Sequence, residues 1–100
     1  MQETSMHHDH PVNDFASVVD AATQLIDVRE PDEMDEGTLP GAVNIPLGTL
    51  PDRIGELDPN CRVVILCRSG GRSAQACRFL VANGFGDVIN LDGGMLAYNG

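Results

Sequence analysis

Four mostly apolar runs recur along the chain, each followed by proline, glycine or charged residues. They cover residues 24–28, 42–45, 62–66 and 87–91. The run at 62–66, RVVIL, is rich in β-branched residues, a pattern typical of a strand that is buried on both faces of a parallel sheet. We therefore predict four strands, of which this one has the strongest signal.

The segments between these runs are predicted to form helices and turns. They comprise a short helix capped by Asn13 or Asp14, one acidic turn beginning at Pro31, a weak helix over 48–56, a helix over 73–83 closed by Gly84, and a helical stub over 95–98. Strands that alternate with helices predict an α/β fold with a mainly parallel sheet. In such folds ligands bind at the carboxyl ends of the strands.

The N-terminal residues are polar and show no periodic pattern. We predict a flexible tail over 1–12 and one domain over 13–100. The tail holds all three histidines, His7, His8 and His10. Histidines of an unstructured tail can chelate a metal but do not make a preformed site, so we predict no metal centre.

The charge composition excludes several classes of function. Fifteen carboxylates and six arginines give a formal net charge of −9, and the chain contains no lysine. Walker-type phosphate loops and Schiff-base chemistry both need a lysine. The negative charge argues against nucleic acids and anionic membranes as partners.

The sequence shows neither a run of ~20 apolar residues nor an export signal. Its three cysteines, an odd number without metal-binding spacing, favour a reducing compartment. We therefore predict a cytoplasmic protein without a bound cofactor.

The segment CRSGGRS, between the strongest strand and a helix, carries the clearest chemistry. Cys67 stands at the carboxyl end of the strand, and Gly70 and Gly71 permit the positive φ angles that turn successive N–H groups inward. Those N–H groups, the helix N-terminus and the guanidinium groups of Arg68 and Arg72 all favour a thiolate. Because every histidine lies in the tail, the cradle itself must activate the nucleophile.

The cysteines also allow less reactive interpretations. Cys67 could be a small hydrophobic residue in a tight connection, although two arginines and two glycines are an unusual way to build an inert turn. Cys77 shares a helix face with Leu80 and Val81, which predicts core packing, with a resolving thiol as the alternative. Cys61 precedes the strand and is interpreted as incidental.

Four segments of the chain resemble the rhodanese-like (sulfurtransferase) family in its single-domain form. They are LIDVRE (25–30), LPGAVNIP (39–46), CRSGGRS (67–73) and LDGGMLAY (91–98), in the order of the family and with compatible spacing. The resemblance implies a central, mainly parallel sheet flanked by helices on both faces. It also implies a cysteine that takes a sulfane sulfur from an anionic donor such as thiosulfate and passes the persulfide sulfur to cyanide, a small thiol or a protein thiol.

Carried over to this chain, the resemblance makes Cys67 the nucleophile. The residues implied to cradle the persulfide and bind the donor are Arg68, Ser69, Gly70, Gly71, Arg72 and Ser73. Asp27 and Arg29 of the first motif are predicted to serve the scaffold or to border the site. The chain departs from the family at Thr38, where histidine is frequent, and at Tyr98, where tryptophan is frequent; these departures concern packing and pocket shape.

Two alternatives remain within the same fold class. Cys-based phosphatases and arsenate reductases use a C-x5-R loop, whereas here Arg72 follows Cys67 after four residues. The smaller ring should suit one sulfur atom or thiosulfate better than a phosphate ester. A non-catalytic interaction module of this fold is the second alternative, although the cysteine and its cradle are both intact.

Overall fold

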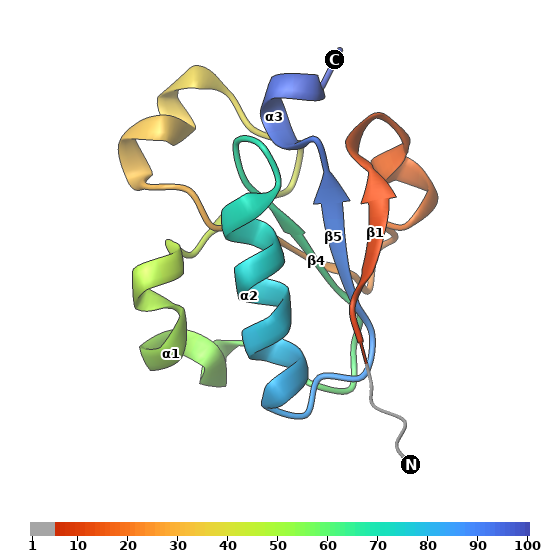
Figure 1. The fold of residues 1–100 in the computed structure, drawn as a ribbon, viewed down its shortest axis with the longest axis vertical. Helices are drawn as coiled ribbons and strands as arrows, with labels where there is room; N and C mark the ends of the chain where they lie inside the picture. The colour runs from red at the N-terminus through yellow and green to blue at the C-terminus, as the bar shows by residue number, and fades with distance from the viewer. Residues whose placement is uncertain (1–5) are drawn as a thin grey trace.

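The computed structural model describes residues 6–100 and contains one sheet of five parallel strands (Figure 1). The strand order is β1-β5-β4-β2-β3, and each neighbouring pair is parallel. The strands are β1 (His8–Pro11), β2 (Gln24–Asp27), β3 (Val43–Asn44), β4 (Val63–Leu66) and β5 (Val88–Asp92). The prediction of an α/β fold with a mainly parallel sheet is confirmed.

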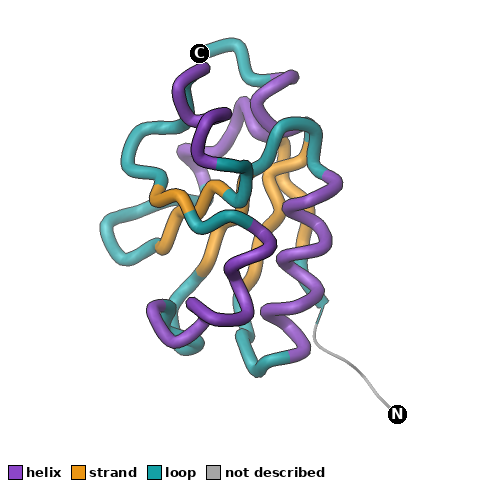
Figure 2. Tube along the Cα trace, turned by 90° about the vertical axis from the view of Figure 1, so that its left-hand side faces the viewer, coloured by secondary structure: helices purple, strands orange, loops and turns teal. Residues whose placement is uncertain are grey.

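Short helices connect the strands. They are η1 (Val12–Ser17), η2 (Pro31–Glu36), η3 (Leu47–Thr49), α1 (Leu50–Arg53), η4 (Ile54–Glu56), α2 (Gly71–Ala82) and α3 (Gly94–Ala97). The longest of them, α2, lies in front of β4 in Figure 1 and runs along one side of the strands in Figure 2. It begins two residues earlier than predicted, because Gly70, at φ 108°, turns the chain directly into the helix.

The core lies on both faces of β4, as the unbroken apolar run predicts. Val63 and Ile65 belong to the hydrophobic cluster that includes α2, whereas Val64 and Leu66 belong to the cluster on the opposite face. None of the four side chains has measurable exposure. Successive residues of a strand point to opposite faces, so one strand anchors both layers.

The structure corrects the prediction of a tail that extends through residue 12. His8–Pro11 form the edge strand β1, in which His8 pairs with Ile89 and Pro11 with Asp92 of β5. Polar residues suit this position, since an edge strand needs hydrogen bonds on one side only and leaves most of its side chains in solvent. The predicted tail over residues 1–5 lies outside the described residues.

Over residues 6–100, no group of three histidine, cysteine or acidic side chains could hold a metal ion. His10 instead lies 2.9 Å from the carboxylate of Asp14. Within the same residues, no helix has the length and apolar character needed to cross a membrane.

The carboxyl ends of the central strands gather the candidate residues at one edge of the sheet. β2 ends at Asp27, β4 ends immediately before Cys67, and β5 leads into α3. All parallel strands of a sheet point the same way, so these segments meet at the edge where ligands bind in α/β folds.

Candidate active site

Cys67 lies at the base of a tight loop between β4 and α2. The backbone N–H of Gly70 donates a hydrogen bond to the Cys67 sulfur at 3.0 Å, and the Ser73 hydroxyl oxygen lies 3.2 Å from the same sulfur. The loop reverses this tightly because Gly70 adopts a positive φ, as the glycine pair predicts. Gly71 is already the first residue of α2.

The Ser73 hydroxyl lies between two acceptors. It can donate to the Gly70 carbonyl at 3.1 Å or to the Cys67 sulfur, but it has one proton to give. Ionisation of Cys67 makes the sulfur the stronger acceptor and favours rotation of the proton toward it. The sequence singled out Ser73 as part of the loop but did not predict this contact.

The sulfur is almost completely enclosed, with 1 % of the Cys67 surface exposed. Burial is the largest single influence on the Cys67 thiol and opposes ionisation. The Ser73 hydroxyl and the backbone N–H groups of Ser73, Gly70 and Ser69 together outweigh it, so the pKa of Cys67 lies below its ordinary value. The direction agrees with the sequence prediction, and the N–H groups are part of its cause.

The α3 segment is hydrogen-bonded to the backbone of the loop. The backbone N–H of Met95 donates to the Cys67 carbonyl and that of Leu96 to the Arg68 carbonyl, both at 2.9 Å. A Cβ on Gly94 would lie 2.5 Å from each of these carbonyl oxygens. The LDGGM segment therefore needs glycine at this position for close approach, a role that sequence reasoning missed although the two glycines after a strand signalled it.

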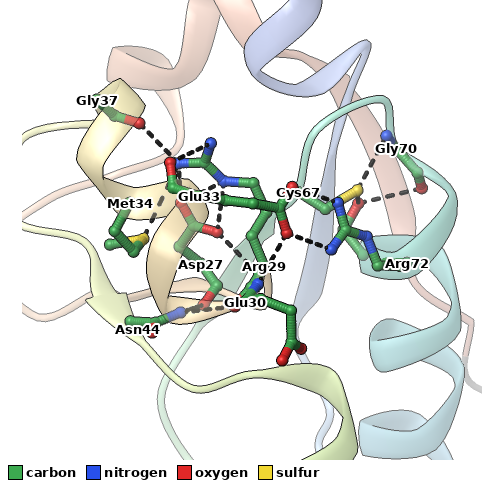
Figure 3. A network of polar contacts seen from close by, with 11 residues as sticks. Asp27, Arg29, Glu30, Glu33, Met34, Gly37, Asn44, Cys67, Gly70 and Arg72 are labelled. Atoms are coloured by element: carbon green, nitrogen blue, oxygen red, sulfur yellow. Dashed lines mark hydrogen bonds and ion pairs between the residues drawn. The ribbon is translucent and has the colours of Figure 1, made fainter.

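Asp27 and Arg29 form a buried ion pair at the end of β2 (Figure 3). The Asp27 carboxylate accepts hydrogen bonds from the Arg29 guanidinium at 2.8 to 3.1 Å and from the Thr38 hydroxyl at 2.7 Å. Arg29 also donates to the carbonyl of Gly37 at 2.7 Å. The pair ties η2 and the following turn to the sheet, which supports a scaffold role.

Arg72 points from the first turn of α2 toward η2. Its two terminal nitrogens donate to the two carboxylate oxygens of Glu33, at 2.6 and 2.9 Å. Arg68 is exposed in the loop and has no salt-bridge partner within residues 6–100. The sequence predicted both arginines as donor-binding groups, and the structure gives them different surroundings.

An open pocket of about 170 Å³ adjoins the loop. It is lined by Arg29, Glu36, Gly37, Arg68, Met95 and Leu96. Arg29 thus lines this pocket as well as pairing with Asp27.

The remaining cysteines have less reactive surroundings. Burial raises the pKa of Cys77 to about 12, and its side chain packs in the same cluster as Cys67. Cys61 lies 3.5 Å from an Asp58 carboxylate oxygen, and this contact raises the pKa of its thiol. Neither shares the N–H donors that surround Cys67.

Comparison with known proteins assigns the chain to a family. The model of the family described as the rhodanese-like domain matches residues 12–100. The chain belongs to the rhodanese-like domain family.

Relatives of this rhodanese-like domain are named as sulfurtransferases. A sulfurtransferase of Allochromatium vinosum is 45% identical over 74 residues, which are 74% of this chain and 69% of that protein. A thiosulfate sulfurtransferase of Shewanella oneidensis is 33% identical, with 88% of both chains covered. Among solved structures, a rhodanese-like domain protein of Staphylococcus aureus superposes with a TM-score of 0.80 at 31% identity, covering 94% of this chain and 91% of that one.

These findings confirm the rhodanese-like fold and the sulfurtransferase family. Cys67 follows β4 directly, and hydrogen bonds from α3 hold the loop that contains it.

Proposed function

We propose that this domain transfers a sulfane sulfur from thiosulfate, or a similarly small donor, through a persulfide on Cys67. The observation that carries the proposal is the pair of donors on one sulfur, the Gly70 N–H at 3.0 Å and the Ser73 hydroxyl at 3.2 Å. These contacts stabilise a negative charge on the sulfur, so the thiolate forms without a neighbouring base.

The cycle has two displacement steps. The Cys67 thiolate attacks the outer sulfur of thiosulfate, the new S–S bond forms, and sulfite leaves with the electron pair of the broken S–S bond. Cyanide or an acceptor thiolate then attacks the terminal sulfur of the persulfide, and Cys67 leaves as a thiolate. Thiocyanate or an acceptor persulfide is released, and neither step needs a cofactor.

The donor site in this proposal consists of the residues of the loop and the start of α2. The backbone N–H groups of Ser69, Gly70 and Ser73 act on the Cys67 sulfur, and Arg68 supplies positive charge to the donor. The enclosed sulfur favours a donor whose terminal sulfur is unhindered, which suits thiosulfate and persulfides better than phosphate esters. The name of the Shewanella relative supports thiosulfate as the first donor to test.

A protein thiol is the proposed physiological acceptor class alongside small thiols. Each cycle returns Cys67 to a thiolate, so we expect the protein to work in a reducing compartment such as the cytoplasm.

Intact-protein mass spectrometry tests the proposal. Thiosulfate should add one sulfur atom to the wild-type protein, and cyanide should remove it. Cys67→Ser should abolish the gain, whereas Cys77→Ser, a matched change at a buried thiol, should retain it. Persistence of the gain in Cys67→Ser would contradict the assignment, and hydrolysis of a phosphate ester without any gain would favour the phosphatase alternative.

A further inference from the structure

Glu33 holds the guanidinium of Arg72 in a bidentate ion pair beside the Cys67 loop (Figure 3). Paired geometry of this kind is the strongest arrangement between an arginine and a carboxylate. Arg72 therefore presents much less free positive charge to a donor than its place in the loop motif implies.

Glu33 is itself held in place by η2. One of its carboxylate oxygens accepts a hydrogen bond from the N–H of Glu30 at 2.9 Å, and its carbonyl accepts one from Arg29 at 3.2 Å. The Arg72 hydrogen bonds, followed by the contact with Glu30, lower the pKa of Glu33 to about 2. Glu33 is thus ionised at neutral pH, and its carboxylate is fixed by hydrogen bonds from both Glu30 and Arg72.

Arg72 lies within electrostatic reach of the reactive sulfur. Glu33 is the main cause that raises the pKa of Arg72, and the negative charge of Cys67 adds to this effect. Charged groups lie on several elements around Cys67. They are Arg68 in the loop, Arg72 and Arg78 on α2, Glu30, Asp32, Glu33, Asp35 and Glu36 on and beside η2, the Asp27–Arg29 pair at the end of β2, and Asp92 at the end of β5 beside Gly70. Within this set, Glu33 neutralises the charge of Arg72, the arginine in the first turn of α2.

We propose that Glu33 is a specificity-determining residue, which neutralises Arg72 and thereby weakens the preference of the site for doubly charged donors over singly charged ones. The inference rests on the proposed sulfur transfer to Cys67 and extends it to the class of donor. Glu33 does not touch the sulfur, so it acts through Arg72 as a positioning residue. Donors with one negative charge, such as thiosulfonates and persulfides, therefore bind better relative to doubly charged donors than they would beside an unpaired Arg72.

Two donors of similar shape test the charge dependence. Thiosulfate carries two negative charges, and methanethiosulfonate, in which a methyl group replaces one oxygen, carries one. Glu33→Gln removes the carboxylate charge but keeps an oxygen that can accept from Glu30. We expect it to lower the KM for thiosulfate about threefold to tenfold and that for methanethiosulfonate about twofold to threefold, because Coulomb energy scales with donor charge. The kcat should change less than the KM in both cases.

Three further variants complete the test. Arg72→Gln should raise the thiosulfate KM, and the double variant Glu33→Gln/Arg72→Gln should return it toward the wild-type value, because the net charge is restored. Glu56→Gln is the matched control, since it breaks the exposed Arg53–Glu56 pair elsewhere on the surface and should leave both KM values unchanged. If Glu33→Gln alone does not fold, the comparison of Arg72→Gln with the double variant still decides the matter.

Two results of the KM measurements would overturn the inference. An equal change of both KM values in Glu33→Gln would show that donor charge is not involved. A double variant as poor as Arg72→Gln would show that Arg72 binds the donor directly and that Glu33 only holds it.

The pH dependence of alkylation of Cys67 keeps this inference separate from the proposed function. Loss of the Glu33 charge should shift the alkylation profile to lower pH, whether or not any sulfur is transferred. If the wild-type protein takes sulfur from neither donor, the proposed function fails. An unshifted alkylation profile in Glu33→Gln would count against the inference alone.

Discussion

Cys67 and Cys77 belong to the same hydrophobic cluster, and 1 % and 0 % of their surfaces are exposed. Burial is the largest influence on both thiols and opposes ionisation of both. At Cys67 it is outweighed by hydrogen bonds from Ser73, Gly70 and Ser69, and the pKa falls. At Cys77 the negative charge of Asp9 raises the pKa in the same direction as burial. The charge of Arg78 lowers it only slightly, and the pKa rises to about 12. Donor groups aimed at the sulfur, rather than exposure, therefore distinguish a reactive thiol from a packing thiol in this fold.

The largest expected effect is the difference in alkylation rate between the two thiols. Iodoacetamide at about pH 7 should modify Cys67 at least about a thousandfold faster than Cys77, because only the thiolate reacts and its population falls tenfold per pKa unit. Peptide mass spectrometry over a time course measures both rates in one sample. Unfolding in denaturant should make the rates similar, and similar rates in the folded protein would remove the distinction between the two sites.

Gly94→Ala should disturb the Cys67 loop next most strongly. The added Cβ would lie 2.5 Å from the carbonyl oxygens of Cys67 and Arg68, so the loop or α3 must move. We expect sulfur uptake by Cys67 to slow about a hundredfold and the free energy of unfolding to fall by about 2 to 4 kcal/mol. Steady-state transfer rates and thermal denaturation measure the two effects.

The control for this change is Gly55→Ala, where no heavy atom lies within 4 Å of the added Cβ. It should alter neither quantity by much. Normal activity in Gly94→Ala would mean that the position of the loop does not depend on support from α3.

The Cys67 loop and its flanking elements were largely predictable from the sequence, because their signals are local. The apolar run before Cys67 predicts β4, the glycines predict the tight turn, and the segment that ends at Gly84 predicts α2. These elements are close in the chain, so periodicity and turn chemistry are sufficient. The packing of Cys77 was likewise predicted from its helix face.

Contacts between distant segments were not predictable in the same way. Glu33 and Arg72 are 39 residues apart, and the acidic turn PDEMDE offers several carboxylates without indicating which one reaches α2. The edge strand β1 has no apolar alternation, since its stabilisation comes from backbone pairing with β5. Both features depend on how the sheet brings remote segments together.

Ser73→Ala removes one hydrogen-bond donor from the Cys67 sulfur and leaves the surroundings of Cys77 unchanged. Loss of the hydroxyl should raise the pKa of Cys67 and slow its alkylation and sulfur uptake at least about tenfold at neutral pH, because a hydrogen bond to a charged group contributes about 1.5 to 3 kcal/mol. The rate of Cys77 should stay unchanged. Ser17→Ala, which removes an exposed hydroxyl bonded to Asp14, is the matched control. An unchanged rate at Cys67 would assign its activation to the backbone N–H groups alone.

The smallest expected effect concerns the ion pair between Glu33 and Arg72, beside the Cys67 loop. The folded pKa of Glu33, about 2, lies below its ordinary value of 4.5. A depressed carboxylate pKa stabilises the folded state fully above 4.5, and this contribution is lost as the pH falls toward 2. The contribution is about 1 kcal/mol after solvent screening, because the Arg72 side chain is 35% exposed. Urea denaturation at about pH 6 and about pH 3 should therefore show a smaller acid-induced loss of stability in Glu33→Gln than in the wild-type protein. Equal losses would mean that the ion pair adds no net stability and that its role beside Cys67 is electrostatic alone.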